Sequence, residues 1–215
     1  MLFRSSLRFY TWSQPTLSLG YFQAHAERVV DPLLAEVAWV RRPTGGAAIL
    51  HDQELTYALA LPAGAPWHTE ESWLCRFHHG VAAALQGFGV ESRAVMCGEE
   101  KKVGPYLCFF HQTPGDLLVG GHKVVGSAQR RPHGATMQHG SILLGRSSHT
   151  PSLPGIADLS GANVAASDLE RAISTELQNQ TGWSFEPDDW TAAERSAAAH
   201  LEREKYATDA WNEKR

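Results

Sequence analysis

Cysteine is scarce in this sequence of 215 residues, and its few positions exclude two classes of protein. The three cysteines lie at positions 75, 97 and 108, with no Cys-x-x-Cys pair and no cysteine–histidine set at zinc spacing. An odd number of cysteines also argues against a disulfide framework. We therefore expect no metal site, and free thiols that are each either a small buried hydrophobic residue or a candidate nucleophile.

Basic residues are not in excess either, since the 19 lysines and arginines are outnumbered by 23 aspartates and glutamates. A net charge of −4, with arginine pairs only at 41–42 and 130–131, excludes the basic surface typical of a nucleic-acid-binding protein. No apolar run reaches the length of a membrane span, and the N-terminal residues lack the apolar centre and cleavage site of a signal peptide. We expect a cytoplasmic protein that binds neither nucleic acid nor membrane.

What is present fits a single domain across residues 1–215. Hydrophobic residues make up 43% of the chain and charged residues 20%, the proportions of a globular protein with a buried core. Apolar residues at helical spacing predict a helix over residues 70–88, with glycines at its end. Further helices are expected over residues 24–36, 167–180 and 191–205, the last two within a C-terminal helical part at 167–215.

Short alternating runs predict strands between these helices. The hairpin pattern at 116–131 places Gly120 and Gly121 at its turn. Ser167 or Asp168 is expected to cap the first C-terminal helix, and a capping box at 191–194 begins the second. Other strands are expected over 7–12, 54–62, 91–96, 106–111 and 135–145. Strands mixed with helices that gather at a few points indicate the α+β class.

The segment RRPTGGAAILHD, at 41–52, places two adjacent glycines between an arginine pair and a strand. Glycine lets the backbone approach a ligand and adopt positive φ, and a neighbouring arginine can bind a carboxylate or phosphate. The segment matches neither a P-loop nor a dinucleotide-binding fingerprint. On its own it also fits a glycine hairpin turn with arginines on the surface.

Two further segments share this glycine-rich character. Lys123 lies in GGHKVVGSAQ, where the small residues that follow it leave room for a thin acyl chain or for a close backbone approach. The same pattern also fits an exposed strand lysine before a turn. His139 lies beside a glycine in QHGSILL, and a lone histidine of this kind fits a structural role as well.

Taken together and in this order, the three segments resemble the biotin/lipoate protein ligase and octanoyltransferase superfamily. The resemblance extends to LRFYTWSQPTLSLGYFQ near the start and EREKYATDAWNEKR at the end, so it covers nearly the whole chain. It implies an α+β catalytic domain like those of biotin ligases and class II aminoacyl-tRNA synthetases, with a mostly antiparallel sheet, flanking helices and a tunnel for an octanoyl or lipoyl chain. The residues that the resemblance assigns to substrate binding are Arg42, Gly45, Gly46, Ala48, His51, Gly126, Ser127, Ala128, His139 and Gly140.

Cys108 bears on which branch of the superfamily the chain resembles. The transferase branch takes octanoyl from acyl carrier protein, holds it as a cysteine thioester and passes it to a lysine of a lipoyl domain, whereas the ligase branch activates free lipoate with ATP. Cys108 lies 15 positions before Lys123, and cysteine-dependent octanoyltransferases of the Gram-positive type carry their nucleophile in a similar Cys-Phe segment. Ligases often carry such a pair too, but the sequence ends soon after the catalytic-domain signature, so we expect no additional domain of the kind that many ligases append; some ligases keep that domain as a separate chain. The resemblance therefore favours an octanoyltransferase with Cys108 and Lys123 as catalytic residues.

The thiol and the lysine form a coherent chemical pair. A free thiol with a pKa of about 8.5 is mostly protonated at neutral pH, and a nearby ammonium group favours the thiolate. A thioester donor already stores the energy of activation, so no cofactor is expected; a ligase would need ATP and Mg²⁺. The expected partners are octanoyl-acyl carrier protein and apo lipoyl domains, such as glycine-cleavage H protein or the E2 subunits of 2-oxoacid dehydrogenases.

The sequence also departs from the family pattern. Ala47 replaces the usual third glycine of the loop, and Ala58 stands where serine is common. Family members normally begin with a helix before the first aromatic strand, and this chain lacks that helix. Two alternatives therefore stand beside the octanoyltransferase: an ATP-dependent lipoate or octanoate ligase, and a non-catalytic module that binds an acyl group or a lipoyl domain.

Overall fold

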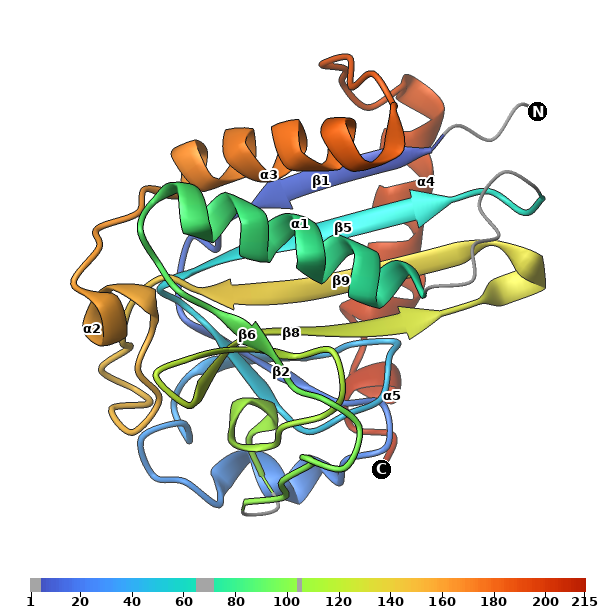
Figure 1. Ribbon diagram of the computed structural model, residues 1–215. Helices are drawn as coiled ribbons and strands as arrows, with labels where there is room; N and C mark the ends of the chain where they lie inside the picture. Colours follow the sequence, from blue (N-terminus) through green and yellow to red (C-terminus); the bar gives the residue numbers. More distant parts are fainter. Residues whose placement is uncertain (1–4, 65–71, 104–105) are drawn as a thin grey trace.

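Six strands form the larger of two sheets in the computed structural model, which describes residues 5–64, 72–103 and 106–215 (Figure 1). Their order is β1-β5-β9-β8-β7-β6, and every neighbouring pair is antiparallel. This mostly antiparallel sheet, with helices beside it, confirms the predicted α+β class. The strands are β1 (Ser6–Tyr10), β5 (Glu54–Leu61), β6 (Arg93–Ala94), β7 (Leu117–Val119), β8 (His122–Arg130) and β9 (Thr136–Leu143).

A smaller sheet lies next to the larger one (Figure 1). Its central strand, β2 (Thr16–Leu19), pairs in parallel with β3 (Ala38–Arg41) and antiparallel with β4 (Ile49–His51). The arginine–glycine segment connects β3 to β4. That segment therefore begins and ends in this sheet, which fixes both of its ends.

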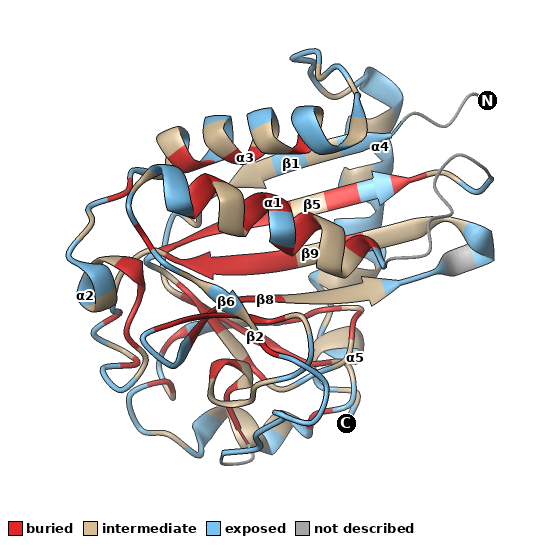
Figure 2. Cartoon of the chain, viewed as in Figure 1, coloured by how far each residue is buried: buried red, intermediate tan, exposed pale blue. Residues whose placement is uncertain are grey.

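One face of the larger sheet carries the main hydrophobic core. Helices α1 (Trp73–Gly87) and α3 (Ala166–Thr181) cover this face, and their inward residues are buried (Figure 2). Side chains alternate across a strand, so Leu55, Tyr57 and Leu59 of β5 all point into this core. The opposite face of the same strands carries the candidate site.

The remaining helical elements are short or lie on the surface. They are the 3-10 turns η1 (His25–Val29), η2 (Cys108–Phe110) and η3 (Pro132–Gly134), helix α2 (Ile156–Ser160), helix α4 (Ala192–Leu201), the π-helical turn η4 (Glu202–Tyr206) and helix α5 (Asp209–Asn212). No helix in the described part of the chain combines the length and apolar character needed to cross a membrane.

Several expected elements are confirmed. The hairpin β7–β8 turns at Gly120 (φ 54°) and Gly121 (φ 83°), the two positive φ values that a tight hairpin of this kind needs. Helix α1 matches the expected helix from residue 73 onward, while residues 70–71 lie outside the described residues. Thr191 caps α4 in a reciprocal capping box with Glu194, as predicted.

Three expectations about local structure are wrong. Residues 24–36 form only the short turn η1 followed by further turns, because Pro32 lacks an amide hydrogen and disfavours helical backbone before it. The expected strand at 106–111 is instead the turn η2, in which the amide of Phe110 donates to the carbonyl of Leu107. Helix α3 begins at Ala166 with Ala165 as its N-cap residue and no side-chain cap, so neither Ser167 nor Asp168 caps it.

Candidate active site

Lys123 and Cys108 lie together in the structure. The Lys123 ammonium Nζ is 4.0 Å from the Cys108 Sγ and 2.7 Å from an Asp116 carboxylate oxygen. Lys123 and Asp116 are 5% and 3% exposed, so this ion pair is buried, whereas Cys108 is half-buried. The ring of Phe109, next to the cysteine, lies 5.4 Å from the ammonium. A buried ammonium group is therefore fixed beside a half-buried thiol.

Gly126 provides the space that Lys123 occupies. A Cβ atom on Gly126 would lie 2.5 Å from the Lys123 Cε and 2.9 Å from its Nζ. A bulge in the β7–β8 pairing, where Leu117 faces Val125 and Leu118 faces Lys123, brings the lysine onto the face toward which Gly126 is open. The small residue that sequence analysis associated with an acyl chain thus accommodates the lysine's own side chain.

Backbone hydrogen bonds fix Cys108 to the arginine–glycine segment. The Cys108 amide donates to the Ala48 carbonyl at 2.7 Å, and the Ala48 amide donates to the Tyr106 carbonyl at 2.9 Å. Leu107 and Ala48 thereby form an isolated parallel bridge. Two segments that sequence analysis singled out separately, at 41–52 and around Cys108, are one structural unit.

Arg42 organises the loop between β3 and β4. Its guanidinium donates to the carbonyls of Ser18 at 2.7 Å, Gly45 at 2.9 Å and Ala47 at 2.6 Å. Only 7% of Arg42 is exposed, and burial lowers its pKa to about 10, so it stays charged at neutral pH. Within the described residues it has no carboxylate partner and its Nε is unpaired. Sequence analysis expected an arginine that contacts substrate; the structure shows one whose terminal nitrogens hold the loop.

The loop is compact around its glycines. Gly46 has a φ of 92°, which favours glycine, while Ala47 is outside the left-handed region, so the alanine in place of a third glycine fits without strain. A Cβ atom on Gly20, at the end of β2, would lie 1.8 Å from the Gly46 carbonyl oxygen. The loop therefore lies directly against β2.

His139 faces this loop from β9. Its Nε2 lies 2.7 Å from the hydroxyl oxygen of Thr44, and burial, with the charge of Arg42 and then His51, lowers the His139 pKa to about 4. The contacts of His51 are structural, because its Nδ1 is 2.7 Å from a Glu54 carboxylate oxygen and its ring stacks on Trp12. Of the two histidines, only His139 contacts the arginine–glycine loop.

Ser127 and Gly140 lie on the other face of the sheet. The Ser127 hydroxyl bonds to Tyr57 and lies 2.5 Å from the Nε2 of His78 on α1. A Cβ atom on Gly140 would point at the same hydroxyl and at the Tyr57 ring. The structure therefore does not bring these two residues together with Lys123. Their positions on the core face do not support a direct contact with a substrate at Lys123. Ala128, one position beyond Ser127, returns to the face of Gly126.

Two residues that contact the expected site residues were not predicted from the sequence: Asp116, which pairs with Lys123, and Thr44, which bonds to His139. Asp116 reads as an ordinary turn residue in TPGD. An undistorted two-residue hairpin would place it across from residue 125, on the same face as Lys123, so the alternation of side chains along the hairpin was the signal that could have found it. Thr44 carried no sequence signal beyond its place in the loop.

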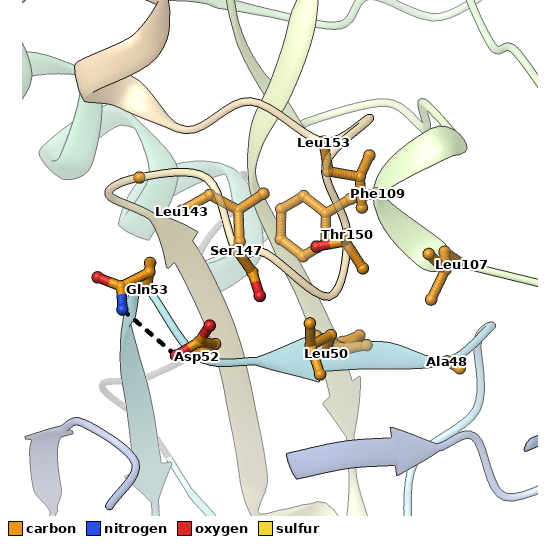
Figure 3. A pocket seen from close by; sticks show the side chains of 12 residues that line it. Ala48, Leu50, Asp52, Gln53, Leu107, Phe109, Leu143, Ser147, Thr150 and Leu153 are labelled. Atoms are coloured by element: carbon orange, nitrogen blue, oxygen red, sulfur yellow. Dashed lines mark hydrogen bonds between the residues drawn. The ribbon is translucent and has the colours of Figure 1, made fainter. Parts of the chain in front are cut away.

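Two cavities adjoin these residues. The smaller, about 20 Å³, has space for about one water molecule, and Leu107 and Phe109, on either side of Cys108, help to line it with Ala48 and Leu50 (Figure 3). The larger, about 380 Å³, lies at the other end of the loop. It is lined by Tyr21, Phe22, Pro43, Thr44, Gly45, Gln129, Arg130, Lys205 and Trp211.

The fold is shared with lipoate protein ligases. A lipoate-protein ligase A solved with ATP bound superimposes with a TM-score of 0.79 at 22% identity, covering 98% of this chain and 86% of the other. A bipartite lipoate protein ligase from Thermoplasma acidophilum gives a TM-score of 0.73 at 20% identity, covering 98% and 84%. At these identities the comparison shows the architecture of the catalytic domain.

Sequence similarity identifies the family. Residues 4–162 match the lipoyl protein ligase A/B catalytic domain, so the chain belongs to this family. Octanoyltransferase LipM of Kyrpidia tusciae is 33% identical, with 96% of this chain and 86% of the relative aligned. Octanoyltransferase LipM of Bacillus subtilis is 29% identical, with 97% and 86% aligned. The predicted resemblance is confirmed, and the protein is an acyltransferase.

Proposed function

We propose that the protein transfers an octanoyl group from octanoyl-acyl carrier protein, through a thioester on Cys108, to a lysine of an apo lipoyl domain. The observation that carries the proposal is the 4.0 Å separation between the Cys108 Sγ and the Lys123 Nζ at the end of the arginine–glycine loop. The relatives named octanoyltransferase support the octanoyl group, and the lipoyl domain that accompanies the Thermoplasma ligase supports the class of acceptor.

In the first half-reaction, the Cys108 sulfur attacks the thioester carbonyl of the donor and a new C–S bond forms. The bond to the carrier thiol breaks, and that thiol leaves with the proton that Cys108 gives up. Because Asp116 lies closer to the ammonium than the cysteine does, it neutralises much of the charge on Lys123. Lys123 therefore acts best as an oriented donor of a hydrogen bond to the carbonyl oxygen, where negative charge develops.

In the second half-reaction, the neutral amine of the acceptor lysine attacks the Cys108 thioester. An amide bond forms, the C–S bond breaks, and Cys108 recovers its proton from the attacking amine. Lys123 donates to the same oxygen again. The donor thioester supplies the energy, so the proposed reaction uses neither ATP nor a metal ion.

The larger cavity fits the far end of the acyl chain. The Lys123 Nζ lies beside Gly126. Residues 129–130, which line the larger cavity, are three and four positions further along β8, a distance of about 10–13 Å in an extended strand. An extended eight-carbon chain has a comparable length. The chain would run from Cys108 beneath the loop, past Ala128 and His139, towards Thr44 and Gly45 at the cavity.

Intact-mass measurement tests the proposal. The protein is incubated with octanoyl-acyl carrier protein, and we expect the mass increase of one octanoyl group, removable by neutral hydroxylamine, and its transfer to an apo lipoyl domain. Cys108→Ser should lose hydroxylamine-sensitive labelling and transfer, whereas the matched control Cys97→Ser, at an exposed position, should keep both.

Normal transfer by Cys108→Ser would exclude the covalent route. Transfer only from free octanoate with ATP and Mg²⁺ would replace the transferase with a ligase. Failure of both donors, with lipoyl domain still bound, would indicate a binding module.

A further inference from the structure

A continuous hydrogen-bond chain crosses the core behind the candidate site. His78, on α1, is 1% exposed, and burial lowers its pKa to about 4, so the imidazole is neutral and carries one N–H. Its Nδ1 lies 2.5 Å from the Gly115 carbonyl oxygen, which can only accept. The N–H is therefore on Nδ1, and Nε2 accepts from the Ser127 hydroxyl.

The fixed tautomer sets the direction of every other bond in the chain. Because Ser127 gives its hydrogen to His78, the Tyr57 hydroxyl donates to Ser127. The Tyr57 oxygen accepts from the Gln138 amide nitrogen at 2.6 Å, and the Gln138 carbonyl oxygen accepts from the Gln129 amide nitrogen at 2.7 Å. Each donor in this chain has one acceptor, and the chain ends at Gly115.

Gly115 belongs to the turn that orients Asp116. The Gly115 amide donates to the Val95 carbonyl at 2.9 Å, and the Val95 amide donates to the Asp116 carbonyl at 2.8 Å, so Val95, directly after β6, holds one side of the turn. The amide and hydroxyl of Thr113 donate to the Asp116 carboxylate at 2.7 and 2.9 Å. His78 holds the other side of the turn through the Gly115 carbonyl.

We propose that His78 is a positioning residue for the acyl transfer reaction: by donating from Nδ1 to Gly115, it fixes the turn that aims the Asp116 carboxylate at Lys123. The inference rests on the proposed function, because the aligned Lys123 is the donor to the reacting carbonyl. His78 lies on the opposite face of the sheet from Cys108 and touches no reacting atom. It acts by fixing the position of the Lys123–Asp116 ion pair relative to the Cys108 thiol.

Substitution of His78 separates this role from simple packing. His78→Leu removes the bond to Gly115, and we expect kcat for octanoyl transfer to fall between about tenfold and a hundredfold, with KM for the lipoyl domain within about twofold. His78→Asn keeps an amide donor near the position of Nδ1 and should recover much of the loss. Val81→Ala, at a buried apolar position of the same helix, destabilises the core without touching the turn and should leave kcat unchanged.

A double-mutant cycle tests whether His78 acts through Asp116. In an Asp116→Asn background the aimed carboxylate is already lost, so adding His78→Leu should cause little further loss of kcat. Losses that multiply, or a His78→Leu enzyme with wild-type kcat, would overturn the proposal.

Amide hydrogen exchange gives a readout that does not depend on the proposed reaction. Exchange in residues 113–116 should accelerate in His78→Leu and stay as in wild type in Val81→Ala, both measured under conditions where the proteins remain folded. If wild-type protein transfers no octanoyl group, the proposed function fails, and the exchange result alone decides the inference. Unchanged exchange in His78→Leu would reject it.

Discussion

The indole Nε1 of Trp211 donates a hydrogen bond of 2.8 Å to the backbone carbonyl of Arg41, 170 positions earlier in the chain. Asn212 completes the contact, since its side-chain oxygen accepts from the Arg41 amide and its carbonyl accepts from the Arg41 Nε, both at 2.8 Å. The C-terminal segment thus binds the last residue of β3, immediately before the arginine–glycine loop. Trp211 also lines the larger cavity.

This contact predicts that the C-terminal segment holds the loop in place for substrate. Trp211→Phe keeps an aromatic ring but removes the donor to Arg41, and we expect KM for the acyl donor to rise several-fold while kcat changes little. Loss of this partly buried hydrogen bond should lower the free energy of unfolding by about 1 kcal/mol. Steady-state kinetics and denaturant melts measure the two effects.

Trp190→Phe is the matched control for that substitution. Trp190 lies against the guanidinium of Arg8 on the edge strand β1, and the guanidinium carbon is 4.5 Å from the ring centroid. The Trp190→Phe substitution should leave KM for the acyl donor unchanged. Equal kinetic effects of the two substitutions would show that the indole contact with Arg41 has no role in substrate binding.

Gly126→Ala should displace Lys123. The new Cβ would lie within 3 Å of both the Cε and the Nζ of the lysine, which must leave its place beside Asp116 and Cys108. We expect kcat to fall by about a hundredfold, as for a misplaced catalytic group. Overpacking of this buried site should also cost about 1–3 kcal/mol of stability. Gly87→Ala, where an added Cβ meets open space, should change neither quantity.

Gly20→Ala should force the loop away from β2. Its Cβ would collide with the Gly46 carbonyl, a backbone atom that no side-chain rotation can move aside. We expect a loss of about 1–3 kcal/mol in stability and a higher KM for the acyl donor. In Gly145→Ala the nearest atom is the Gln53 Cβ at 3.8 Å, an ordinary contact, so this variant should behave as wild type. Unaltered donor KM in Gly20→Ala would show that the loop position does not control binding.

Much of the fold could be predicted from the sequence, because it depends on patterns local to each element. The spacing of apolar residues defined α1, and two adjacent glycines defined the turn of the β7–β8 hairpin. The failures occurred where distant segments decide the local conformation. Cys108 lies in a turn because its amide bonds to Ala48, sixty positions away in sequence, and no property of YLCFFH alone indicates this.

The candidate site shows the same division. The pairing of Cys108 with Lys123 came from the family resemblance, and the structure brings the two together. Asp116 was missed, although alternation along the hairpin places it on the same face as Lys123, because TPGD reads as an ordinary turn. The bulge, which the sequence does not mark, changes which residues of β8 share a face with Lys123, and Ser127 lies on the opposite face.

Two histidines with lowered pKa values predict a loss of stability in mild acid. His78 and His139 both have a pKa lowered from 6.5 to about 4 by burial, so the native protein keeps them neutral. As the pH falls below about 6.5, the unfolded chain binds protons that the native protein does not, and the free energy of unfolding decreases until the pH approaches 4. Each histidine should cost about 2 kcal/mol between pH 7.5 and pH 5.

Denaturant melts at pH 7.5 and pH 5 check this prediction, and variants isolate the histidines from other titrating groups. His139→Gln should shrink the stability difference between the two pH values by about 2 kcal/mol, whatever its effect at either pH alone. His122→Gln, at an exposed position beside the hairpin turn, should leave the difference intact. If the stability difference between the two pH values is the same in wild type and His139→Gln, native His139 binds a proton as readily as the unfolded chain does. That result would contradict the lowered pKa, which follows from the burial of the ring beside Arg42.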